Sequence, residues 1–144
     1  MPVNGGARNG VTNVLVSQTH HDGSYALAFP ALIDLTNTYN ASVTVPICPG
    51  STINLSGYTM SAWIYVTGTD LGSETFLFFD AWGPSGMISS PALMGEKLNT
   101  LNTWQQATTT FSSPVDADHV SIRLNDPPSW TGTIYVDSVT ITPP

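Results

Sequence analysis

Apolar and polar side chains alternate strictly along residues 58–66, and a period of two is satisfied only by an extended strand with one buried side. The side predicted to be buried carries four apolar residues: Met60, Ala62, Ile64 and Val66. The opposite side carries Ser61, Trp63 and Tyr65. An aromatic ring on the solvent side of a sheet gains most from a flat apolar partner, such as the face of a sugar ring. The stretch therefore predicts a strand with one core side and one side suited to a ligand.

Short alternating runs recur along the rest of the chain, separated by Gly, Pro, Asn and Asp. Because proline lacks an N–H group, its placement between these runs agrees with their being strands. No segment shows a sustained 3.6-residue apolar period. We therefore predict an all-β chain, a β-sandwich or jelly roll of two antiparallel sheets with about nine strands and essentially no helix. The expected strands are residues 11–18, 24–29, 31–35, 41–47, 58–67, 74–81, 103–111, 119–125 and 132–142.

The length of 144 residues suits one domain with a proper core, so we expect residues 1–144 to form a single module. Residues 1–10 should be irregular, and residues 83–100 should form a loop across one end of the sandwich, with a helical turn near 92–97. The N-terminus lacks the features of a signal peptide, and we interpret it as the start of an excised piece of a secreted parent. Pro143 and Pro144 would begin a linker to another domain.

The charge balance excludes several classes of partner. Only three residues are Lys or Arg, against ten Asp or Glu, and the formal net charge is −7. Nucleic acids need clustered cationic side chains, so they are excluded, and anionic lipids or polyanionic polysaccharides are poor candidates. Charged residues form 9% of the chain against roughly 25% in ordinary soluble domains. Such a polar but weakly charged surface suits an extracellular β-protein that meets neutral polar ligands.

The sequence contains neither a membrane span nor a disulfide. No run of about 18 apolar residues occurs, so no transmembrane helix is expected. Cys48 is the only cysteine, which rules out an intramolecular disulfide. Its neighbours Ile47 and Pro49 favour a small buried side chain over a reactive thiol.

Residues 119–125 predict a second ligand-bearing strand. If Val120, Ile122 and Leu124 face the core, then Ser121, Arg123 and Asn125 face outward. If this strand shares a sheet with residues 58–67, one open surface would carry aromatic rings, a guanidinium and an amide. Rings stack on the C–H faces of a pyranose, and polar groups bond its hydroxyls. Two alternatives stay open: Trp63 in the core with Tyr65 at a sheet edge, and Arg123 in a solvated ion pair with a neighbouring Asp.

Two further tryptophans lie beside Gly and Pro, Trp82 in residues 80–84 and Trp130 in residues 128–132. A stiff turn can project an indole rigidly, so each could form a wall beside a sugar-binding groove. Each could equally be a lid over an end of the sandwich. Asp80 could accept hydroxyl hydrogen bonds beside Trp82, or only form a turn.

Three phenylalanines in one strand, Phe76, Phe78 and Phe79, cannot all face inward under strict alternation. Either Phe78 or Phe79 must therefore be exposed or lie at a bulge.

Several segments together resemble a known class of proteins. Residues 55–66 resemble a central strand, and residues 22–27 an early strand, of carbohydrate-binding modules of the galactose-binding-like jelly-roll class. Residues 102–111, 120–124 and 130–141 are similar to that class's closing strands. The resemblance implies two stacked antiparallel sheets, non-catalytic polysaccharide binding and attachment to a secreted carbohydrate-active enzyme. Within it, Trp104 matches a structural tryptophan of the class, which implies a place in the core.

The same resemblance implies a structural calcium ion, because Asp137 matches an Asp near the last strand that commonly binds one. A carboxylate in the middle of an apolar strand is costly unless it is paired or bound to a metal. The class also uses an early Glu, but residues 3–18 contain no acidic side chain. Asp22 or backbone oxygens around Gly23 would have to replace it.

Catalysis is not expected. The only glutamates are Glu74 and Glu96, and no carboxylate pair falls on the outward side of adjacent expected strands, as a glycosidase would need. His20, His21 and His119 lack the spacing of a zinc site.

We therefore predict a secreted, monomeric, non-catalytic module that binds a neutral polysaccharide of the β-glucan, xylan or mannan type and is covalently linked to a catalytic domain. The predicted ligand-binding residues are Trp63, Tyr65, Asp80, Trp82, Gln106, Arg123, Asn125 and Trp130. The alternatives are a structural or adhesive extracellular β-sandwich and a small jelly-roll glycosidase or lyase.

Overall fold

Strand β6 (Thr59–Val66) follows the alternation of its sequence residue by residue in the computed structural model. Its four apolar side chains are at most 1% exposed, whereas Ser61, Trp63 and Tyr65 are half-buried on the opposite side. The predicted orientation of Trp63 and Tyr65, away from the core, is therefore confirmed. The structure describes residues 10–12, 14–30, 41–47, 50–68, 76–88, 94–97, 100–112, 116–125 and 132–144.

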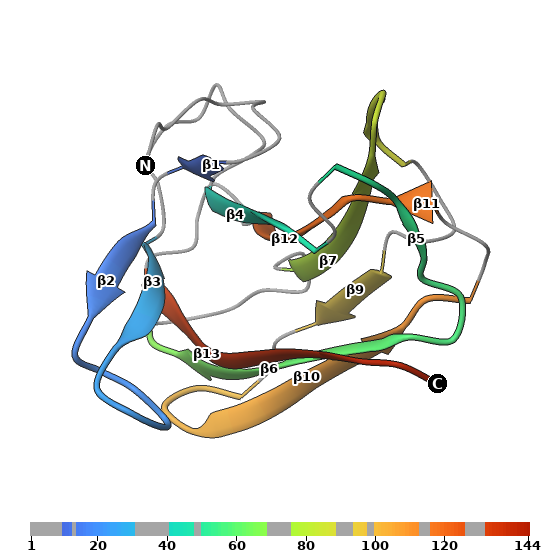
Figure 1. Ribbon diagram of the computed structural model, residues 1–144. Helices are drawn as coiled ribbons and strands as arrows, with labels where there is room; N and C mark the ends of the chain where they lie inside the picture. The colour runs from blue at the N-terminus through green and yellow to red at the C-terminus, as the bar shows by residue number, and fades with distance from the viewer. Residues whose placement is uncertain are drawn as a thin grey trace.

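The strands form two main antiparallel sheets that lie one over the other (Figure 1). The β12 sheet has the order β1 (Gly10–Thr12), β4 (Ala41–Pro46), β12 (His119–Asn125), β7 (Phe76–Gly83) and β8 (Gly86–Met87), and β9 (Met94–Lys97) also pairs with β7. The β6 sheet has the order β10 (Trp104–Thr110), β6, β13 (Thr133–Thr142), β3 (Ala26–Pro30) and β2 (Leu15–Ser17). A short ladder joins β11 (Asp116–Ala117) to β5 (Ile53–Asn54). The predicted all-β sandwich of antiparallel sheets is thus confirmed.

The core fills the space between the inner faces of the two sheets. Strands β6 and β13 supply it from one side and strands β7 and β12 from the other. Burying large apolar side chains contributes roughly 1.5–3 kcal/mol each relative to exposure, so this layer holds the sheets together. The largest fully buried side chains are Phe29, Leu55, Met60, Ile64, Val66, Leu77, Phe111, Val120, Ile134 and Val136.

Two predictions about elements are wrong. Residues 83–100 were predicted to form a loop with a helical turn near 92–97, but residues 86–87 form β8 and residues 94–97 form β9, and both pair with β7. Residues 11–18 were expected to form one strand, but they contain two. Because β1 pairs with β4 in one sheet and β2 pairs with β3 in the other, the chain changes sheets within this segment.

Some predictions fall outside the described residues. They include the strand at residues 31–35 and the burial of Cys48. Among the described residues, none belongs to a helical segment with the length and hydropathy of a membrane span.

Candidate functional site

The predicted ligand-binding residues divide between the two sheets. Trp63, Tyr65 and Gln106 lie on β6 and β10, whereas Asp80, Trp82 and Arg123 lie on β7 and β12. Each group points away from the shared core, so the two groups face opposite sides of the sandwich. The prediction of one surface that combines Trp63 with Arg123 is therefore wrong. Alternation sets which side of its own strand a residue occupies, but not which sheet the strand joins.

Two predicted residues are not placed in detail. Asn125 ends β12, but its side chain is outside the described part of the structure, and Trp130 is outside it altogether. Their predicted contacts with a ligand stay predictions.

The outer side of the β12 sheet presents a mixed polar and aromatic surface, which we call the Arg123 face. Pairing of β12 with β4 and β7 sets Ser121 between Thr44 and Asp80 in one cross-strand row. Arg123 is opposite Phe78 in the next row. The Arg123 face comprises the outward side chains of these three strands: Thr44, Pro46, Phe78, Asp80, Trp82, His119, Ser121 and Arg123.

The centre of the Arg123 face is an ion pair. Arg123 donates from Nε to Asp80 Oδ2 at 2.8 Å and from Nη2 to Asp80 Oδ1 at 3.4 Å. The Asp80 side chain is fully buried and that of Arg123 is 11% exposed. Arg123 does pair with an Asp, as the alternative for this residue had it, but the alternative is wrong in expecting a solvated pair, because this one is buried. The Arg123 guanidinium also lies over the Phe78 ring, 4.4 Å from its centroid, in a cation–π contact.

Trp82 joins this pair through Ser121. Trp82 Nε1 donates to Ser121 Oγ at 2.8 Å, and Ser121 Oγ donates to Asp80 Oδ2 at 3.4 Å. The prediction that Trp82 sits in a loop is wrong, since β7 extends through it to Gly83 and places its indole on the sheet surface. Trp82, Ser121, Asp80 and Arg123 thus form one connected network that fixes the orientation of the half-buried indole.

The phenylalanine ambiguity is resolved without a bulge in the pairing of β7 with β12. Phe79 is 2% exposed in the core, and Phe78 is half-buried on the Arg123 face. The sequence predicted that Ser121 faces outward and that Phe78 or Phe79 is exposed, but it did not predict a binding role for Ser121 or Phe78, and His119 was missed. Ser121 and His119 fall two and four residues before Arg123 in one strand, so alternation carried the signal.

The outer side of the β6 sheet presents a second surface, which we call the Tyr65 face. Trp104, Tyr65 and Tyr135 are register partners on β10, β6 and β13, so their rings form one cross-strand row. The Tyr65 ring lies 5.4 Å from that of Trp104 and 6.1 Å from that of Tyr135. The expected place of Trp104 in the core is therefore wrong, because register puts it on the same side as Tyr65. The Tyr65 face comprises the outward side chains Ser61, Trp63, Tyr65, Trp104, Gln106, Tyr135 and Asp137.

Part of the Tyr65 face is covered by the chain itself. The His21 imidazole stacks on the Trp63 indole with centroids 4.2 Å apart and planes within 8°. The same imidazole meets Trp104 edge-on at 5.4 Å. One face of the Trp63 ring is therefore occupied by an intramolecular partner, which leaves less of it for a ligand.

Asp137 anchors the segment that carries His21. Its Oδ2 accepts the backbone N–H groups of His21 at 2.7 Å and Asp22 at 2.9 Å, and its Oδ1 accepts that of Ser138 at 2.6 Å. Partial burial by itself raises the pKa of Asp137, but the hydrogen bonds from Asp22, His21 and Ser138 outweigh it and hold the pKa below its ordinary value. Ser138 has φ 51° at a bulge in β13, which brings its amide to the carboxylate.

These contacts do not suit a calcium ligand. Three amide hydrogens point at the Asp137 carboxylate, where a cation would need free oxygen lone pairs. Within the ranges that the structure covers, no group of three or more His, Cys, Asp or Glu side chains could hold a metal ion. The half-buried carboxylate of Asp137 is accounted for by its amide partners instead.

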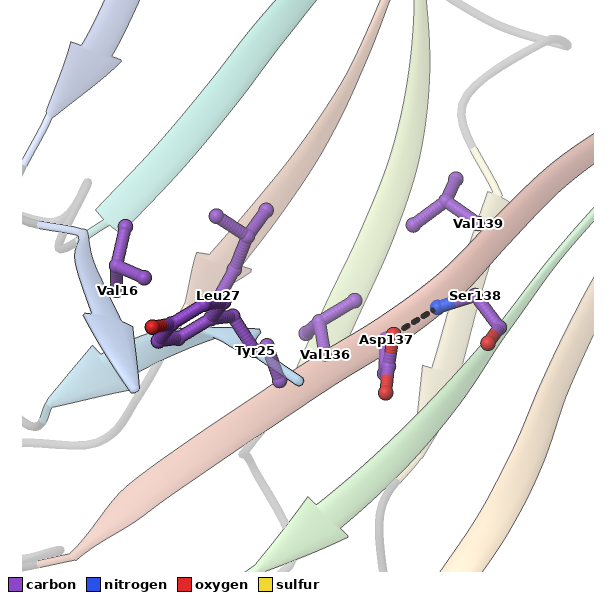
Figure 2. A pocket seen from close by; sticks show the side chains of 8 residues that line it. Val16, Tyr25, Leu27, Val136, Asp137, Ser138 and Val139 are labelled. Atoms are coloured by element: carbon purple, nitrogen blue, oxygen red, sulfur yellow. Dashed lines mark hydrogen bonds between the residues drawn. The ribbon is translucent and has the colours of Figure 1, made fainter. Parts of the chain in front are cut away.

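A pocket of about 280 Å³ opens beside this bulge (Figure 2). Figure 2 shows Leu27 and Val136 on one side of β13 and Asp137 pointing to the other, with its bond to the Ser138 amide dashed. The lining residues are Val16, Tyr25, Ala26, Leu27, Val136, Asp137, Ser138 and Val139. A mainly apolar lining whose one carboxylate is already bonded does not resemble a site for a hydroxyl-rich ligand.

Comparison with known proteins bears on the fold. No protein-family model matches the sequence, and no curated protein matches it either. Solved structures do match. A family 16 carbohydrate-binding module aligns with a TM-score of 0.55 and 14% identity, over 90% of this chain and 85% of that one. The xylan-binding module CBM15 aligns with a TM-score of 0.56 and 20% identity, over 91% and 90%. The chain has the β-sandwich fold of carbohydrate-binding modules.

Other matching structures are of longer chains, of which this chain covers only a part. The chain spans 18% of the enzymatically active domain of bacteriophage CBA120 tailspike protein 4, which aligns with 92% of this chain at a TM-score of 0.59 and 16% identity. It spans 55% of a chain from a study of promiscuous carbohydrate-binding modules of the β-sandwich superfamily, with a TM-score of 0.58 and 17% identity. At these sequence identities the similarity establishes the β-sandwich fold alone. The ligand has to be inferred from the residues of this chain.

Proposed function

We propose that this protein binds a neutral polysaccharide of the β-glucan, xylan or mannan type, without catalysis, on its Arg123 face. The observation that carries the proposal is the hydrogen bond that locks the Trp82 indole to Ser121 beside the buried Asp80–Arg123 pair. A ring that is already fixed loses little conformational entropy when a sugar stacks on it. Fixed polar groups beside such a ring also match the way small-molecule sites combine an apolar surface with a few placed polar atoms.

The expected affinity is modest. Stacking removes apolar area from water at about 25 cal/mol per Å², and association costs several kcal/mol. One or two stacked sugars therefore give dissociation constants of roughly micromolar to millimolar size. A module that must release and rebind a polymer functions well in that range.

Charge favours a neutral ligand. The carboxylate of Asp80 is neutralised by Arg123 within the network, so the centre of the face carries no net charge. The whole chain has a formal net charge of −7, which repels polyanions at longer range. Uronic-acid polymers are therefore expected to bind more weakly than neutral glycans.

The state of the carboxylates supports binding without catalysis. A glycosidase needs two carboxyl groups placed about 5–9.5 Å apart around the scissile bond. Asp80 is buried against Arg123, Asp137 accepts three amides and Asp118 is bonded to His119. These three groups are engaged in structural contacts.

The Tyr65 face is a second candidate location for the same ligand. Its row of Trp104, Tyr65 and Tyr135 supplies aromatic surface, and Gln106 is the register partner of Trp63 beside it. The Arg123 face is preferred because it joins a fixed indole to polar groups, whereas the rings of the Tyr65 face pack on one another and on His21.

We further propose that the module is secreted as a monomer and attached to a carbohydrate-active enzyme. Support comes from longer matching structures that are enzymes: the chain spans 23% of an exo-β-agarase and 27% of xylanase 10C from Cellvibrio japonicus. In each, this fold accounts for a minor part of the chain.

Electrophoresis through native gels that contain soluble neutral glycans tests the function. Retardation in gels with mixed-linkage β-glucan, xylan or glucomannan is expected, and little retardation with polygalacturonate. Unchanged migration across this panel would reject glycan binding and favour a structural or adhesive domain. Release of reducing or unsaturated ends from any of these polymers would instead indicate an enzyme.

A further inference from the structure

The two ring nitrogens of His119 differ in their hydrogen bonding. Nδ1 lies 2.8 Å from Asp118 Oδ1. Nε2 is buried and has no hydrogen-bond partner in the part of the chain that the structure describes. A buried nitrogen without a partner is costly, and such groups in native proteins usually await a water, an ion or a ligand.

The contact with Asp118 sets the chemistry of Nε2. An ionised carboxylate can only accept hydrogen bonds, so the ring hydrogen of the neutral imidazole is on Nδ1. Nε2 then presents a lone pair and acts as an acceptor. A group that donates a hydrogen, such as a hydroxyl, is its natural partner.

His119 is held firmly at the Trp82 end of the Arg123 face. It is the register partner of Trp82 on β7 and of Pro46 on β4. The neighbouring Asp118 donates its backbone N–H to the Trp82 carbonyl at 2.9 Å and accepts the Ile47 N–H at 2.9 Å. The His119 and Asp118 side chains are 12% and 16% exposed, so the imidazole has little room to turn away.

We propose that His119 Nε2 accepts a hydrogen bond from a hydroxyl of the sugar that stacks on Trp82, and so selects sugars with a free hydroxyl at that position. This inference rests on the proposed function. A pyranose stacked on an indole directs its equatorial hydroxyls outward in the plane of its ring, toward residues beside the indole. Since His119 is the cross-strand neighbour of Trp82, its ring is on the same side of the sheet as the indole, and a shift of the imidazole toward the sugar would bring Nε2 to its hydroxyl.

Two other roles for Nε2 agree less well with the contacts. A histidine whose other nitrogen is bonded to a carboxylate resembles a metal ligand, but the described residues hold no cluster of three or more metal-ligating side chains. Asp118, His119 and Ser121 also have the residue types of a hydrolase triad. Ser121 Oγ, however, is bonded to Trp82 and Asp80, and its side chain is 1% exposed, so it is not positioned as a nucleophile.

Calorimetric titrations with cellohexaose, xylohexaose and mannohexaose test the inference on four proteins: wild type, His119→Phe, His119→Gln and Trp82→Ala. His119→Phe keeps a ring without an acceptor, and His119→Gln can place an amide oxygen near the position of Nε2. We expect His119→Phe to bind the preferred hexaose roughly 10- to 100-fold more weakly than wild type, and His119→Gln to recover most of that loss. The ¹⁵N resonance of Nε2 in the wild-type protein should shift when this hexaose is added.

Three results would overturn the inference, and they are distinguishable. If Trp82→Ala loses binding while His119→Phe binds like wild type, the proposed function stands and Nε2 has no part in it. If His119→Phe does not fold, an Nε2 resonance that does not shift in the wild-type protein rejects the inference by itself. If wild type binds none of the three hexaoses, both the function and the role of His119 are rejected.

Discussion

Trp82 Nε1 donates a 2.8 Å hydrogen bond to Ser121 Oγ, and this bond crosses from β7 to β12 on the outer side of one sheet. It connects an aromatic ring to a buried ion pair through one hydroxyl. Outward positions of a sheet normally carry solvated side chains, yet Asp80 and Ser121 are at most 1% exposed there. Because these polar side chains are buried and hydrogen-bonded, as they would be in a protein core, we expect the surface to have the same geometry before and after a ligand binds.

Removing the Trp82 ring should weaken glycan binding strongly without unfolding the protein. Trp82→Ala is expected to weaken binding to the preferred hexaose at least about 10-fold, because the stacking surface is lost. Tyr65→Ala is the matched control, since it removes a half-buried ring from the opposite sheet. Isothermal titration calorimetry of both variants measures the difference. Loss of binding in Tyr65→Ala with retention in Trp82→Ala would move the site to the Tyr65 face.

Breaking the buried ion pair should cost much stability. Asp80→Ala leaves Arg123 largely buried without its carboxylate partner, for which about 3–5 kcal/mol of unfolding free energy is the usual loss. For a domain of this size, that loss should lower the melting temperature by more than about 10 °C. Asp116→Ala, at an exposed position of β11, is the control and should change the unfolding free energy by less than about 0.5 kcal/mol. Equal melting temperatures for the two variants would contradict the buried pair.

The contribution of Asp137 to stability should depend on pH. Its pKa is lower in the folded state than the ordinary value of 3.8, so folding favours the ionised form. That contribution is fully present above pH 3.8 and is lost as the pH falls through the lower folded-state value. Urea unfolding of wild type and Asp137→Asn should therefore give a stability difference that is constant near neutral pH and shrinks in acid. A difference that grows as the pH falls would show that the amides do not stabilise the carboxylate.

Removing the imidazole that covers Trp63 should expose the indole. His21→Ala is expected to shift tryptophan fluorescence to longer wavelength and to lower the unfolding free energy by about 0.5–1.5 kcal/mol, since the stacked contact is lost. His20→Ala is the control, because the His20 ring is exposed and is bonded to the nearby Gln18 carbonyl. Identical spectra for the two variants would mean that His21 does not cover Trp63 in solution.

Local features of the fold were predictable from the sequence. The alternation in residues 119–125 predicts β12 with the bounds that the structure shows, and residues 58–67 contain all of β6. Period-two patterning is a property of one strand, so it needs no knowledge of the partner strands.

Features that depend on strand pairing were not predictable. Whether Arg123 shares a surface with Trp63 depends on β12 and β6 joining different sheets, which is set by contacts between segments far apart in the chain. Trp104 illustrates the same limit, because only its register with Tyr65 takes it out of the core. Trp82 precedes a Gly-Pro pair that is typical of a loop, yet pairing with β12 and β8 extends the strand through it.

The most direct test is to map the bound glycan onto the two faces by NMR. The ¹⁵N–¹H spectrum of the protein would be recorded during titration with the hexaose that binds best. The largest shifts are predicted at the Trp82 indole N–H and at the Ser121 and Arg123 amides, with little change at Tyr65 or Tyr135. Shifts confined to Tyr65, Trp104 and Tyr135, with the Trp82 indole unmoved, would contradict the placement of the site on the Arg123 face.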